Sequence, residues 1–399
     1  MRLLLVAPMP PDPTAAGAIP RVLHAQLNGL SQRHEVSLLV VAGPEAPELA
    51  AVERLRASGV NIRAVQRTDP QGRARWSRRW RLGSTWLRGL WPWRTVWYWD
   101  PGFQAALDEV TRETRFDVVQ VEDNAMGVYR YPGGVPVVLT EHEARRPRPF
   151  YWRSVSARRW LAEEDWRRWK PYQRSVWGRF ARLLVFSARD AQTINTIAPG
   201  LAERIRITPF GVDLPPEACD EVGEGRRLLF VGNFTHQPNV DAALWLGRDV
   251  MPRLRATGSS VDLMIVGIHP PADVRQLAAP DIAVLGAVAD LDAVLQQASI
   301  VVAPVRTGGG MRMKVLHAMA CGKAVVTTSR GAQGFEAKEL VPPLVVADDV
   351  DGITKAIMDL LADRSMRQSL GVLARDYVAK HYSPDAYARR LEAVYAELC

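Results

Sequence analysis

Short apolar runs alternate along the chain with longer segments in which apolar residues recur at helical spacing. In the first half, this pattern predicts buried strands at residues 2–7, 35–41, 60–65, 117–121, 136–140 and 182–186. A helix that begins near Ile19 should follow the first of these strands. Strands that alternate with helical segments are typical of βα units arranged around a parallel sheet.

The alternation begins again after a stretch at 209–225, whose prolines, glycines and acidic residues indicate a linker. The second half predicts strands at 228–232, 261–266, 282–285, 299–303 and 324–327, and helices at 239–255, 290–297, 312–320, 350–362, 364–381 and 384–397. We therefore expect an α/β protein of two Rossmann-like, doubly wound domains that face each other across a cleft. The domains would span 1–208 and 226–383, and a last helix at 384–399 could pack back on the first domain.

The composition is that of a globular protein, with 47% hydrophobic and 24% charged residues. No run approaches the roughly 18 consecutive apolar residues that a membrane-spanning helix needs, and the apolar stretch after Met1 is too short for a signal peptide. The three cysteines, Cys219, Cys321 and Cys399, lie too far apart in the sequence to suggest a disulfide framework or a zinc site. We expect a cytoplasmic protein.

The net charge of +8 is unevenly distributed. Residues 71–99 contain seven arginines and no acidic residue, and residues 144–182 contain eleven arginines and one lysine against three acids. These two segments also hold twelve of the thirteen tryptophans. Trp and Arg together suit a surface that meets anionic lipid headgroups, or one that meets an acidic or lipid-diphosphate-linked acceptor. The alternative is core tryptophans with arginines paired to nearby acids, although 71–99 contains no acid to pair with.

Three familiar motifs are absent or misleading. No G-x-G-x-x-G follows the first strand, which argues against a dinucleotide cofactor. The segment 321–324 looks like part of a phosphate-binding P-loop, but His317 stands where that motif needs glycine and Ala324 where it needs Ser or Thr. Asp349 and Asp351 resemble a metal-binding pair, but they precede an expected helix, where carboxylates cap free N–H groups. We predict no metal and no cofactor.

The most informative segment joins the strand expected at 299–303 to the helix expected at 312–320. It contains Gly308–Gly310, and a backbone without side chains lets a ligand approach the main-chain N–H groups closely. The N-terminal end of the following helix favours a phosphate. Arg312 and Lys314 stand in its first turn, where carboxylates are normally preferred, so an anion should join them. The alternative is a glycine-rich turn with exposed charges.

Residues 204–397 resemble the donor-binding domain of retaining GT-B glycosyltransferases of family 4. The subgroup that the chain is most similar to has a triple glycine, a basic residue, a lysine and then E-A-M-A-x-G. Here the triple glycine and the two basic residues are followed by His-Ala-Met-Ala-Cys-Gly at 317–322, and the segment 228–242 also matches. The resemblance implies a retaining transfer from a nucleoside diphosphate sugar, without a metal.

The resemblance assigns donor-binding roles on three loops: Gly286 and Val288 beside the nucleobase, Gly308–Gly310 beside the diphosphate and sugar, and Arg312 and Lys314 at the leaving diphosphate. Two positions depart from the family pattern. His317 replaces the glutamate that holds the ribose hydroxyls, and histidine lacks the two acceptor oxygens of a carboxylate. Asn233 stands where many relatives carry an arginine.

The first half matches this family less closely, as expected of a domain that binds a variable acceptor. Gly17 is the only glycine near the family's glycine-bearing, donor-binding loop, and Arg21 could reach the cleft from the next helix. A buried strand delivers Glu141, His142 and Glu143 to its carboxyl end, where ligands of open α/β sheets bind. The position of His142 resembles the family's active-site histidine near the donor sugar. A loop histidine without chemistry is the alternative.

The expected activity is transfer of a sugar from a nucleoside diphosphate sugar to a saccharide or lipid-linked acceptor, in cell-surface polysaccharide or glycolipid synthesis. Two other classes stay open. One is a catalytically degenerate GT-B protein that binds a nucleotide or a partner, which His317 motivates. The other is a GT-B epimerase or phosphorylase, since a fold alone does not choose among activities.

The expected partners follow from the same residues. Basic clusters with interleaved aromatics can track single-stranded nucleic acid, but no RNA-binding signature accompanies them, so we expect no nucleic-acid partner. An anionic membrane surface remains a candidate partner for the Arg/Trp segments. The expected location is therefore the cytoplasm, with peripheral attachment at the inner face of the plasma membrane.

Overall fold

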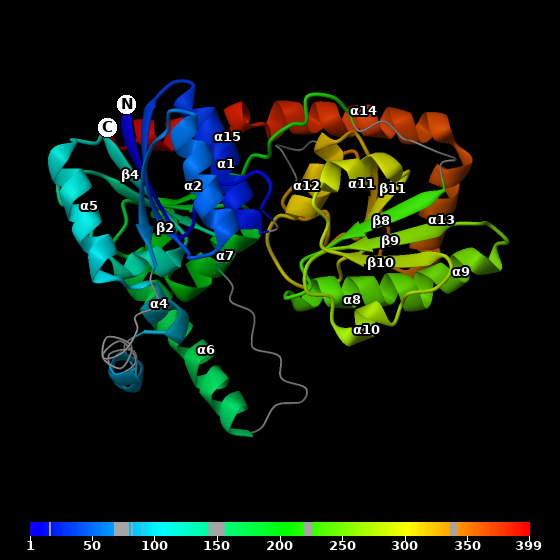
Figure 1. Cartoon of the computed structure of the whole chain (residues 1–399), viewed down its shortest axis with the longest axis horizontal. Helices are drawn as coiled ribbons and strands as arrows, with labels where there is room; N and C mark the ends of the chain where they lie inside the picture. Colours follow the sequence, from blue (N-terminus) through cyan, green and yellow to red (C-terminus); the bar gives the residue numbers. More distant parts are fainter. Residues whose placement is uncertain are drawn as a thin grey trace. The chain divides into compact units, whose positions relative to one another are not determined.

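The computed structural model describes residues 1–15, 17–67, 80, 83–89, 91–142, 144, 156–218, 226–335 and 341–399. Contacts divide the chain into two compact units (Figure 1). The first unit contains Met1–Asp12, Gln26–Thr208 and Ala388–Cys399, and the second contains Pro13–Ala25 and Pro209–Tyr387. Each unit has its own parallel sheet.

A seven-stranded sheet forms the centre of the first unit, in the order β3-β2-β1-β4-β5-β6-β7. Its strands are β1 (Arg2–Ala7), β2 (Glu35–Ala42), β3 (Asn61–Gln66), β4 (Val118–Glu122), β5 (Val137–Glu141), β6 (Arg182–Val185) and β7 (Ile205–Ile207). The helices that contribute to this unit are α1 (Ala18–Ser31), α2 (Ala46–Ala57), α4 (Trp93–Tyr98), α5 (Pro101–Glu113), η1 (Asn124–Val128), α6 (Ser156–Trp177), α7 (Ala188–Ile197), η2 (Pro199–Arg204) and α15 (Pro384–Ala396). All pairings between these strands are parallel.

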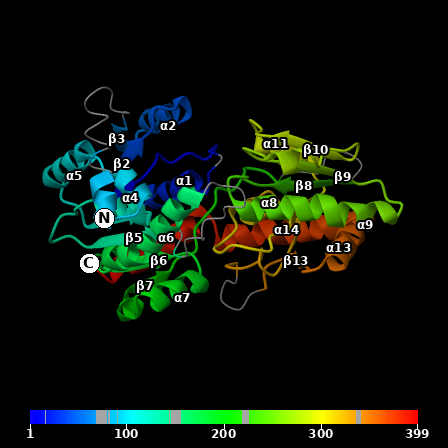
Figure 2. The same cartoon turned by 90° about the horizontal axis from the view of Figure 1, so that it is seen from below.

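The central strands of this sheet are buried on both faces, because helices cover each side (Figure 2). In β1, Leu4 and Val6 share a core with Phe103 of α5 and Trp177 of α6. Leu3 points to the opposite face and is also buried. A strand that is buried on both faces reads as a continuous apolar run, which is why the sequence pattern identifies these strands.

A six-stranded parallel sheet forms the centre of the second unit, in the order β10-β9-β8-β11-β12-β13. Its strands are β8 (Arg227–Val231), β9 (Asp262–Val266), β10 (Ile282–Gly286), β11 (Ile300–Ala303), β12 (Ala324–Thr327) and β13 (Val345–Val346). Its helices are α8 (Gln237–Trp245), α9 (Met251–Ala256), α10 (Ala272–Arg275), α11 (Leu291–Gln297), α12 (Met313–Ala320), α13 (Val350–Ala362) and α14 (Arg364–His381), and a π-helical turn, η3 (Leu246–Val250), joins α8 to α9.

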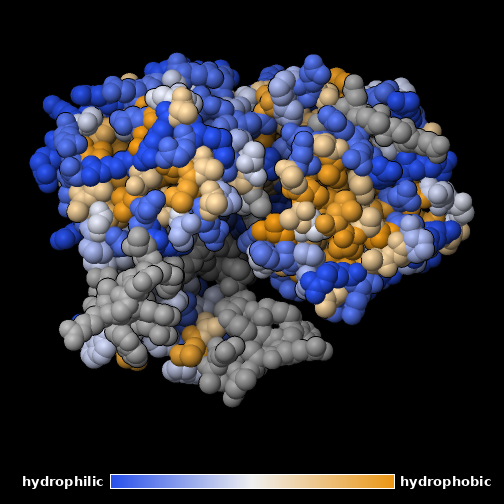
Figure 3. All heavy atoms as spheres, viewed as in Figure 1, coloured by the Kyte–Doolittle hydropathy of each residue, from blue (hydrophilic) through white to orange (hydrophobic). Residues whose placement is uncertain are grey.

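The core of the second unit lies on both sides of its sheet. On one side, Phe230 and Ile265 pack with Val240 of α8 and Ile357 of α13. β10 is an outer strand, and its Leu285 is 48% exposed. Figure 3 shows apolar side chains gathered on the front of this unit, on the side where β10 lies in Figure 1. β10 therefore presents an apolar edge of the sheet to solvent within this unit.

The predicted strands, and the helices predicted in the second half, are confirmed within about two residues of their expected bounds. The pattern did not predict α2, α5, α6 and α7. In α2 only Ala51, Val52 and Leu55 are buried. A helix with so narrow an apolar stripe carries a weak periodic signal, and its packing becomes evident only from the fold.

The boundaries of the units differ from the predicted domains at the start of α1. The segment Pro13–Ala25 is grouped with the second unit. Two of its side chains make contacts within that unit: Arg21 contacts His317, and His24 contacts Asp213. A side chain's partner in a distant segment leaves no trace in the local sequence pattern.

The C-terminal residues return to the first unit, which contains Ala388–Cys399. Tyr395 of α15 is fully buried, and its hydroxyl donates to Gln120 in β4. Of the expected linker, residues 209–218 are described and belong to the second unit. The main-chain N–H of Val212 donates to the carbonyl of Tyr382 over 2.8 Å, which fixes this stretch against the end of α14.

Candidate active site

The loops that carry the predicted donor-binding residues of the second half of the chain all follow the carboxyl ends of strands of the second sheet. β8 and β11 are neighbours, and the strand order continues from β8 to β9 on one side and from β11 to β12 on the other. Such a reversal opens a crevice beyond the carboxyl ends of the two strands, where ligands of open α/β sheets bind. The loop after β8 contains Asn233, and the loop after β11 contains Gly308–Gly310.

The glycine loop has a backbone that other residues adopt only with strain. The φ angle is +90° at Gly308 and +75° at Gly310, in the left-handed region that side chains disfavour. Arg312 holds this loop, since its Nη1 donates to the carbonyl of Gly309 over 2.8 Å and its Nη2 to that of Thr307 over 3.2 Å. Nothing lies within 4 Å of the Cβ position at Gly309 or Gly310, so a ligand can reach the main chain there.

α12 begins directly after the glycine loop. Arg312 occupies its N-cap position, and its side chain makes no capping hydrogen bond to the first N–H groups. The first turn contains no acidic residue. The positive end of this helix dipole therefore faces a loop with two basic residues beside it, an arrangement that favours an anion.

Lys314 is the side chain that joins the two loops at the crevice. Its Nζ donates to Oδ1 of Asn239 over 2.5 Å and lies 4.7 Å from the centre of the Phe230 ring. Burial, together with the nearby charge of Arg312, lowers the pKa of Lys314 to about 7. An anion bound in the crevice would reverse this effect, because an opposite charge favours the protonated amine.

Asn239, which the sequence analysis missed, ties the loop after β8 to α12. Its Nδ2 donates to the carbonyl of Asn233 over 2.7 Å while its Oδ1 accepts from Lys314. The side chain of Asn233 accepts from the N–H and hydroxyl of Thr235 at 3.0 and 2.7 Å. In the sequence, the only feature that pointed to Asn239 as a site residue was its position in the first turn of the helix after β8. Asn233 and Lys314 are thus brought together through one amide.

Gly286 and Val288 lie at the same edge of the sheet, at the carboxyl end of β10. Gly286 has a φ of +70°, and its carbonyl accepts from the N–H of Gly267 over 2.7 Å. Val288 is half-buried in the connection to α11. Since β9 separates β10 from β8, these two residues border the crevice from one side rather than form its centre.

His317 is buried on α12 and contacts two charged side chains. Its Nε2 lies 2.9 Å from Oδ1 of Asp292 in α11, and its Nδ1 lies 3.1 Å from Nη2 of Arg21. A carboxylate can only accept, so Nε2 carries the ring proton and Nδ1 accepts from Arg21. Burial lowers the pKa of His317 against the opposing effect of Asp292, and the hydrogen bond from His317 lowers the pKa of Asp292. Asp292, which was not predicted, supplies a carboxylate next to the residue that lacks one.

His142 follows β5 in the first unit and pairs with a buried carboxylate. Its Nε2 lies 2.8 Å from Oε2 of Glu122, which is fully buried at the end of β4. Burial by itself lowers the pKa of His142, but the hydrogen bond and charge of Glu122, with the charges of Asp123 and Glu141, reverse this and leave the pKa raised. Glu122 was not predicted, because only the pairing of β4 with β5 places it beside His142.

The remaining predicted residues of the first half are Glu141 and Glu143, which flank His142, and Gly17 before α1. Glu141 is 1% exposed and accepts from Nδ2 of Asn124 and, over 2.8 Å, from Nε1 of Trp177. These are the contacts of a structural carboxylate in the core. Glu143 lies outside the described residues.

Gly17 directly precedes α1 and is half-buried, and it belongs to the second unit.

Two motifs that the sequence analysis set aside have structural roles. Asp349 accepts the N–H of Gly352 over 2.6 Å and so caps α13, which confirms the capping interpretation. Asp351 lies 3.6 Å from Arg253. Lys323 is buried, and its Nζ donates to the carbonyl of Ala298 over 3.0 Å. Its ammonium group therefore holds the start of β11 rather than a phosphate.

The Arg/Trp segments are partly core and partly surface within their described residues. Trp169 and Trp177 are buried in the first unit. Trp86 donates its Nε1 hydrogen to Asp165 over 3.1 Å, and the guanidinium of Arg168 lies 4.0 Å from the centre of its ring. Asp165 of α6 thus accepts from a tryptophan of 71–99 rather than from one of its arginines.

Five large apolar side chains of these segments are exposed: Trp80, Leu87, Trp93, Trp160 and Leu161. We call them the exposed Trp/Leu group. Trp80 and Leu87 are 76% and 77% exposed. Within the described residues, no helix combines the length and the apolar character that crossing a membrane requires.

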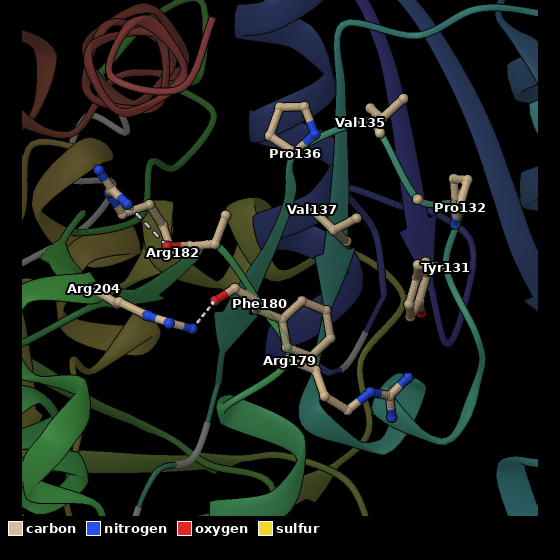
Figure 4. Close-up of a pocket in the computed structure, with 12 residues that line it drawn as sticks. Tyr131, Pro132, Val135, Pro136, Val137, Arg179, Phe180, Arg182 and Arg204 are labelled. Carbon is tan, nitrogen blue, oxygen red and sulfur yellow. Dashed lines mark hydrogen bonds between the residues drawn. The ribbon is translucent and has the colours of Figure 1, made fainter.

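A cavity of about 530 Å³ lies elsewhere in the first unit, at the amino ends of β5 and β6 (Figure 4). Arg179, Arg182 and Arg204 line it, together with Tyr131 and Phe180. The guanidiniums are engaged by protein oxygens: those of Arg179 and Arg204 donate to main-chain carbonyls, and that of Arg182 donates to a carbonyl and to a carboxylate. Of the predicted site residues that the structure describes, none lines this cavity.

Comparisons with known proteins match part of the chain in sequence and the whole chain in fold. Residues 225–363 match the family described as glycosyl transferases group 1. A phosphatidyl-myo-inositol mannosyltransferase of Mycolicibacterium smegmatis is 26% identical over 222 residues, which are 53% of this chain and 55% of the relative. The chain thus spans about half the length of the curated relative that it matches.

Solved structures resemble the whole chain. The structure of Anabaena Alr3699/HepE in complex with UDP has a TM-score of 0.66 at 13% identity and covers 100% of both chains. The sucrose-phosphate synthase of Thermosynechococcus elongatus has a TM-score of 0.65 at 15% identity, over 100% of this chain and 99% of that one. Together with two Rossmann-like parallel sheets, these likenesses confirm the predicted GT-B fold.

The depressed pKa of Lys314 predicts a pH-dependent stability. Below about pH 7 the amine is charged in both the folded and the unfolded chain, so the penalty for burying it is complete. Between that pH and its ordinary value of 10.5, only the unfolded chain holds the proton, and stability rises by at most about 1.4 kcal/mol per pH unit. The variant Lys314→Met should lack this rise, so its melting temperature relative to the native protein should fall as the pH increases.

Melting curves of the two proteins between pH 6.5 and 9.5 measure this difference, because that range begins just below the Lys314 pKa of about 7. The matched control is Lys355→Met, because Lys355 is an exposed lysine of the same unit. A difference between Lys314→Met and the native protein that stays constant with pH would contradict a buried, titrating Lys314.

The pair of His142 with Glu122 predicts a second pH effect. A raised pKa in the folded state means that the pair stabilises the protein fully below the ordinary value of 6.5 and that this stabilisation is lost as the pH rises through the folded value. An NMR titration of the histidine side chains should show His142 titrating above its ordinary value. In Glu122→Gln its midpoint should fall, while the other histidines keep theirs. An unchanged midpoint would exclude Glu122 as the cause.

Proposed function

We propose that the chain is a glycosyltransferase that moves a sugar from a nucleoside diphosphate sugar to a saccharide or lipid-linked acceptor. The observation that carries the proposal is the switch in strand order between β8 and β11, beyond which the glycine loop leads into α12 and Lys314 donates to Asn239. The match of residues 225–363 to glycosyl transferases group 1 supports it. The likeness to the Anabaena protein, whose structure is a complex with UDP, supports it as well.

In this proposal the second unit binds the donor through its diphosphate. Cleavage of the sugar–phosphate bond leaves negative charge on the departing diphosphate. Preorganised N–H groups at the start of α12, with Arg312 and Lys314, would stabilise that charge as it develops. Since Lys314 has a pKa of about 7, binding a diphosphate near neutral pH should be accompanied by uptake of a proton.

Retention of configuration and independence from a divalent metal are part of the proposal through the resemblance to family 4 and its triple-glycine subgroup. Two cationic side chains at the crevice can take the part that a metal plays in other transferases. We assign His142 to the reaction through the same resemblance. A role in cell-surface polysaccharide or glycolipid synthesis fits the lipid-linked acceptor that the curated mannosyltransferase's name suggests.

A second candidate function is nucleotide binding without catalysis. The observation that favours it is His317, which is buried and already engaged with Asp292 and Arg21. A protein of this kind would bind nucleoside diphosphates but would neither transfer nor hydrolyse the sugar. Donor hydrolysis and transfer assays therefore separate the two functions, provided that binding is shown first.

The proposed donor site predicts a selective response to nucleotides. Melting curves with UDP, GDP, ADP, CMP and dTDP should show one clear responder, because a ligand at 100 times its dissociation constant stabilises the fold by about 2.7 kcal/mol. Lys314→Ala should lose most of this response and lower turnover by on the order of 100-fold or more, since it removes a stabilising charge at the leaving group.

Lys355→Ala is the matched control, because it removes an exposed lysine of α13 from the same unit. Its response and turnover should equal those of the native protein. Absence of a response to all five nucleotides would refute the proposed donor site. A response without any turnover of the corresponding sugar nucleotides would support nucleotide binding alone.

We further propose that the exposed Trp/Leu group, together with arginines of the two sequence segments that contain it, attaches the first unit to an anionic membrane surface. Aromatic rings lie at the depth of the headgroups, and arginines pair with their phosphates. Five exposed large apolar side chains within two Arg-rich segments support this proposal. A lipid-linked acceptor would then be met at the surface where it is anchored.

Vesicle sedimentation tests this attachment. The native protein should sediment with vesicles that contain phosphatidylglycerol, should stay in solution with phosphatidylcholine alone, and should release at high salt because screening weakens the ionic contacts. The double variant Leu87→Ser/Trp160→Ser should bind several-fold less. Val372→Ser/Leu373→Ser, which removes exposed apolar side chains of α14, is the control. Equal binding by both double variants would reject the group as the anchor.

A further inference from the structure

Three side chains of different metal-binding chemistry converge between α11 and α12. They are Asp292 near the start of α11, and His317 and Cys321, which stand four residues apart on one face of α12. One ligand atom from each lies within 4.8 Å of the others. His317 and Cys321 are buried, and Asp292 is half-exposed, so the cluster can be reached from one side.

We propose that Asp292, His317 and Cys321 form a binding site for a zinc ion. A thiolate, an imidazole and a carboxylate are the three ligand types that zinc takes in proteins. Because thiolate is a soft ligand, the set favours zinc or cobalt over magnesium or calcium. The fourth position of a tetrahedral ion would face the open side, where Asp292 reaches solvent, and would hold water.

The distances are close to those that an ion would impose. Nε2 of His317 is 2.9 Å from Oδ1 of Asp292, and Sγ of Cys321 is 3.9 Å from that oxygen and 4.0 Å from that nitrogen. With zinc bonds of about 2.0 Å to nitrogen and oxygen and about 2.3 Å to sulfur, tetrahedral ligand atoms lie about 3.3 to 3.5 Å apart. Shifts of about half an ångström would complete the site, which side-chain rotations can provide.

The hydrogen bond from Arg21 to His317 competes with metal binding. Without an ion, Nε2 of His317 holds the ring proton and Nδ1 accepts from Arg21 at 3.1 Å. An ion takes the lone pair of Nε2, so the ring proton must stand on Nδ1, where it would face the N–H groups of the guanidinium. Zinc binding therefore requires Arg21 to withdraw, and the Cys321 thiol to release its proton to solvent.

The site would act as a clamp between α11 and α12. α12 carries the glycine loop at its start, and α11 follows the loop that contains Val288. An ion shared by the two helices would hold these two loops at a fixed separation. Metal binding itself does not rest on the proposed function, so it can be tested without any sugar nucleotide.

Cobalt is the probe, because a thiolate bound to Co²⁺ gives a charge-transfer absorption in the near ultraviolet. The full chain, free of any tag and reduced, is titrated with Co²⁺. We expect this band together with the visible bands of a tetrahedral ion, and their loss when Zn²⁺ is added, since zinc binds such sites more tightly. Zn²⁺ should also raise the melting temperature.

Variants assign the ligands. Cys321→Ala should abolish the charge-transfer band, and Asp292→Asn should weaken Co²⁺ binding at least about 10-fold. Arg21→Met should strengthen it, because the competing donor is gone; a purely structural cluster would not predict this gain. Cys399→Ser is the matched control, since Cys399 is exposed and far from the cluster in sequence.

Two results would overturn the inference. One is the absence of a thiolate band at Co²⁺ concentrations well above that of the protein. The other is a band that persists in Cys321→Ala or disappears in Cys399→Ser, which would place the metal on another cysteine. Native circular dichroism of each variant, measured in parallel, shows whether the loss of binding reflects loss of folding.

Discussion

The parallel pairing of β8 with β11 is the constraint on which the second unit's proposed site depends. These strands run side by side at the centre of the sheet, yet the strand order continues from them in opposite directions. The loops that follow them must therefore separate, and the space between them cannot be closed by the sheet itself. Lys314 and Asn239 span that space with one hydrogen bond, between helices that follow the two strands. A buried ammonium with so few partners is costly, and its low pKa is the measure of that cost.

That cost has a functional explanation within the proposed function. A site that awaits an anion concentrates positive charge where the folded protein alone would avoid it. The glycine loop adds backbone conformations that other residues avoid, and Arg312 uses its hydrogen bonds to hold them. The features that preorganise the site for a diphosphate thus lower the stability of the fold at the same few residues, as is common at preorganised binding sites.

In the first unit, the costly feature is a buried charged pair, Glu122 and His142. Glu122 accepts hydrogen bonds from Gln26, Gln120 and Thr140, and its second oxygen faces His142. Gln120 in turn accepts from Tyr395 of the last helix. Each of these buried side chains makes at least one hydrogen bond, although Oε1 of Gln26 is buried without a partner among the described residues. Because most of its polar atoms are satisfied, the network is tolerated in the interior. It also means that the end of the chain, through α15, supports the residues that position His142.

The sequence alone determined the elements and the glycine-loop chemistry, because both depend on neighbours in the chain. Periods of apolar residues identified the strands, and Gly308–Gly310 with Lys314 identified the anion site that we propose. Tertiary structure decided the partners: Asn239 for Lys314, Glu122 for His142, and Asp292 and Arg21 for His317. Those partners come from other strands and helices, and strand order alone brings them together. A pattern read along the chain records what a residue needs, whereas only the fold shows which distant residue supplies it.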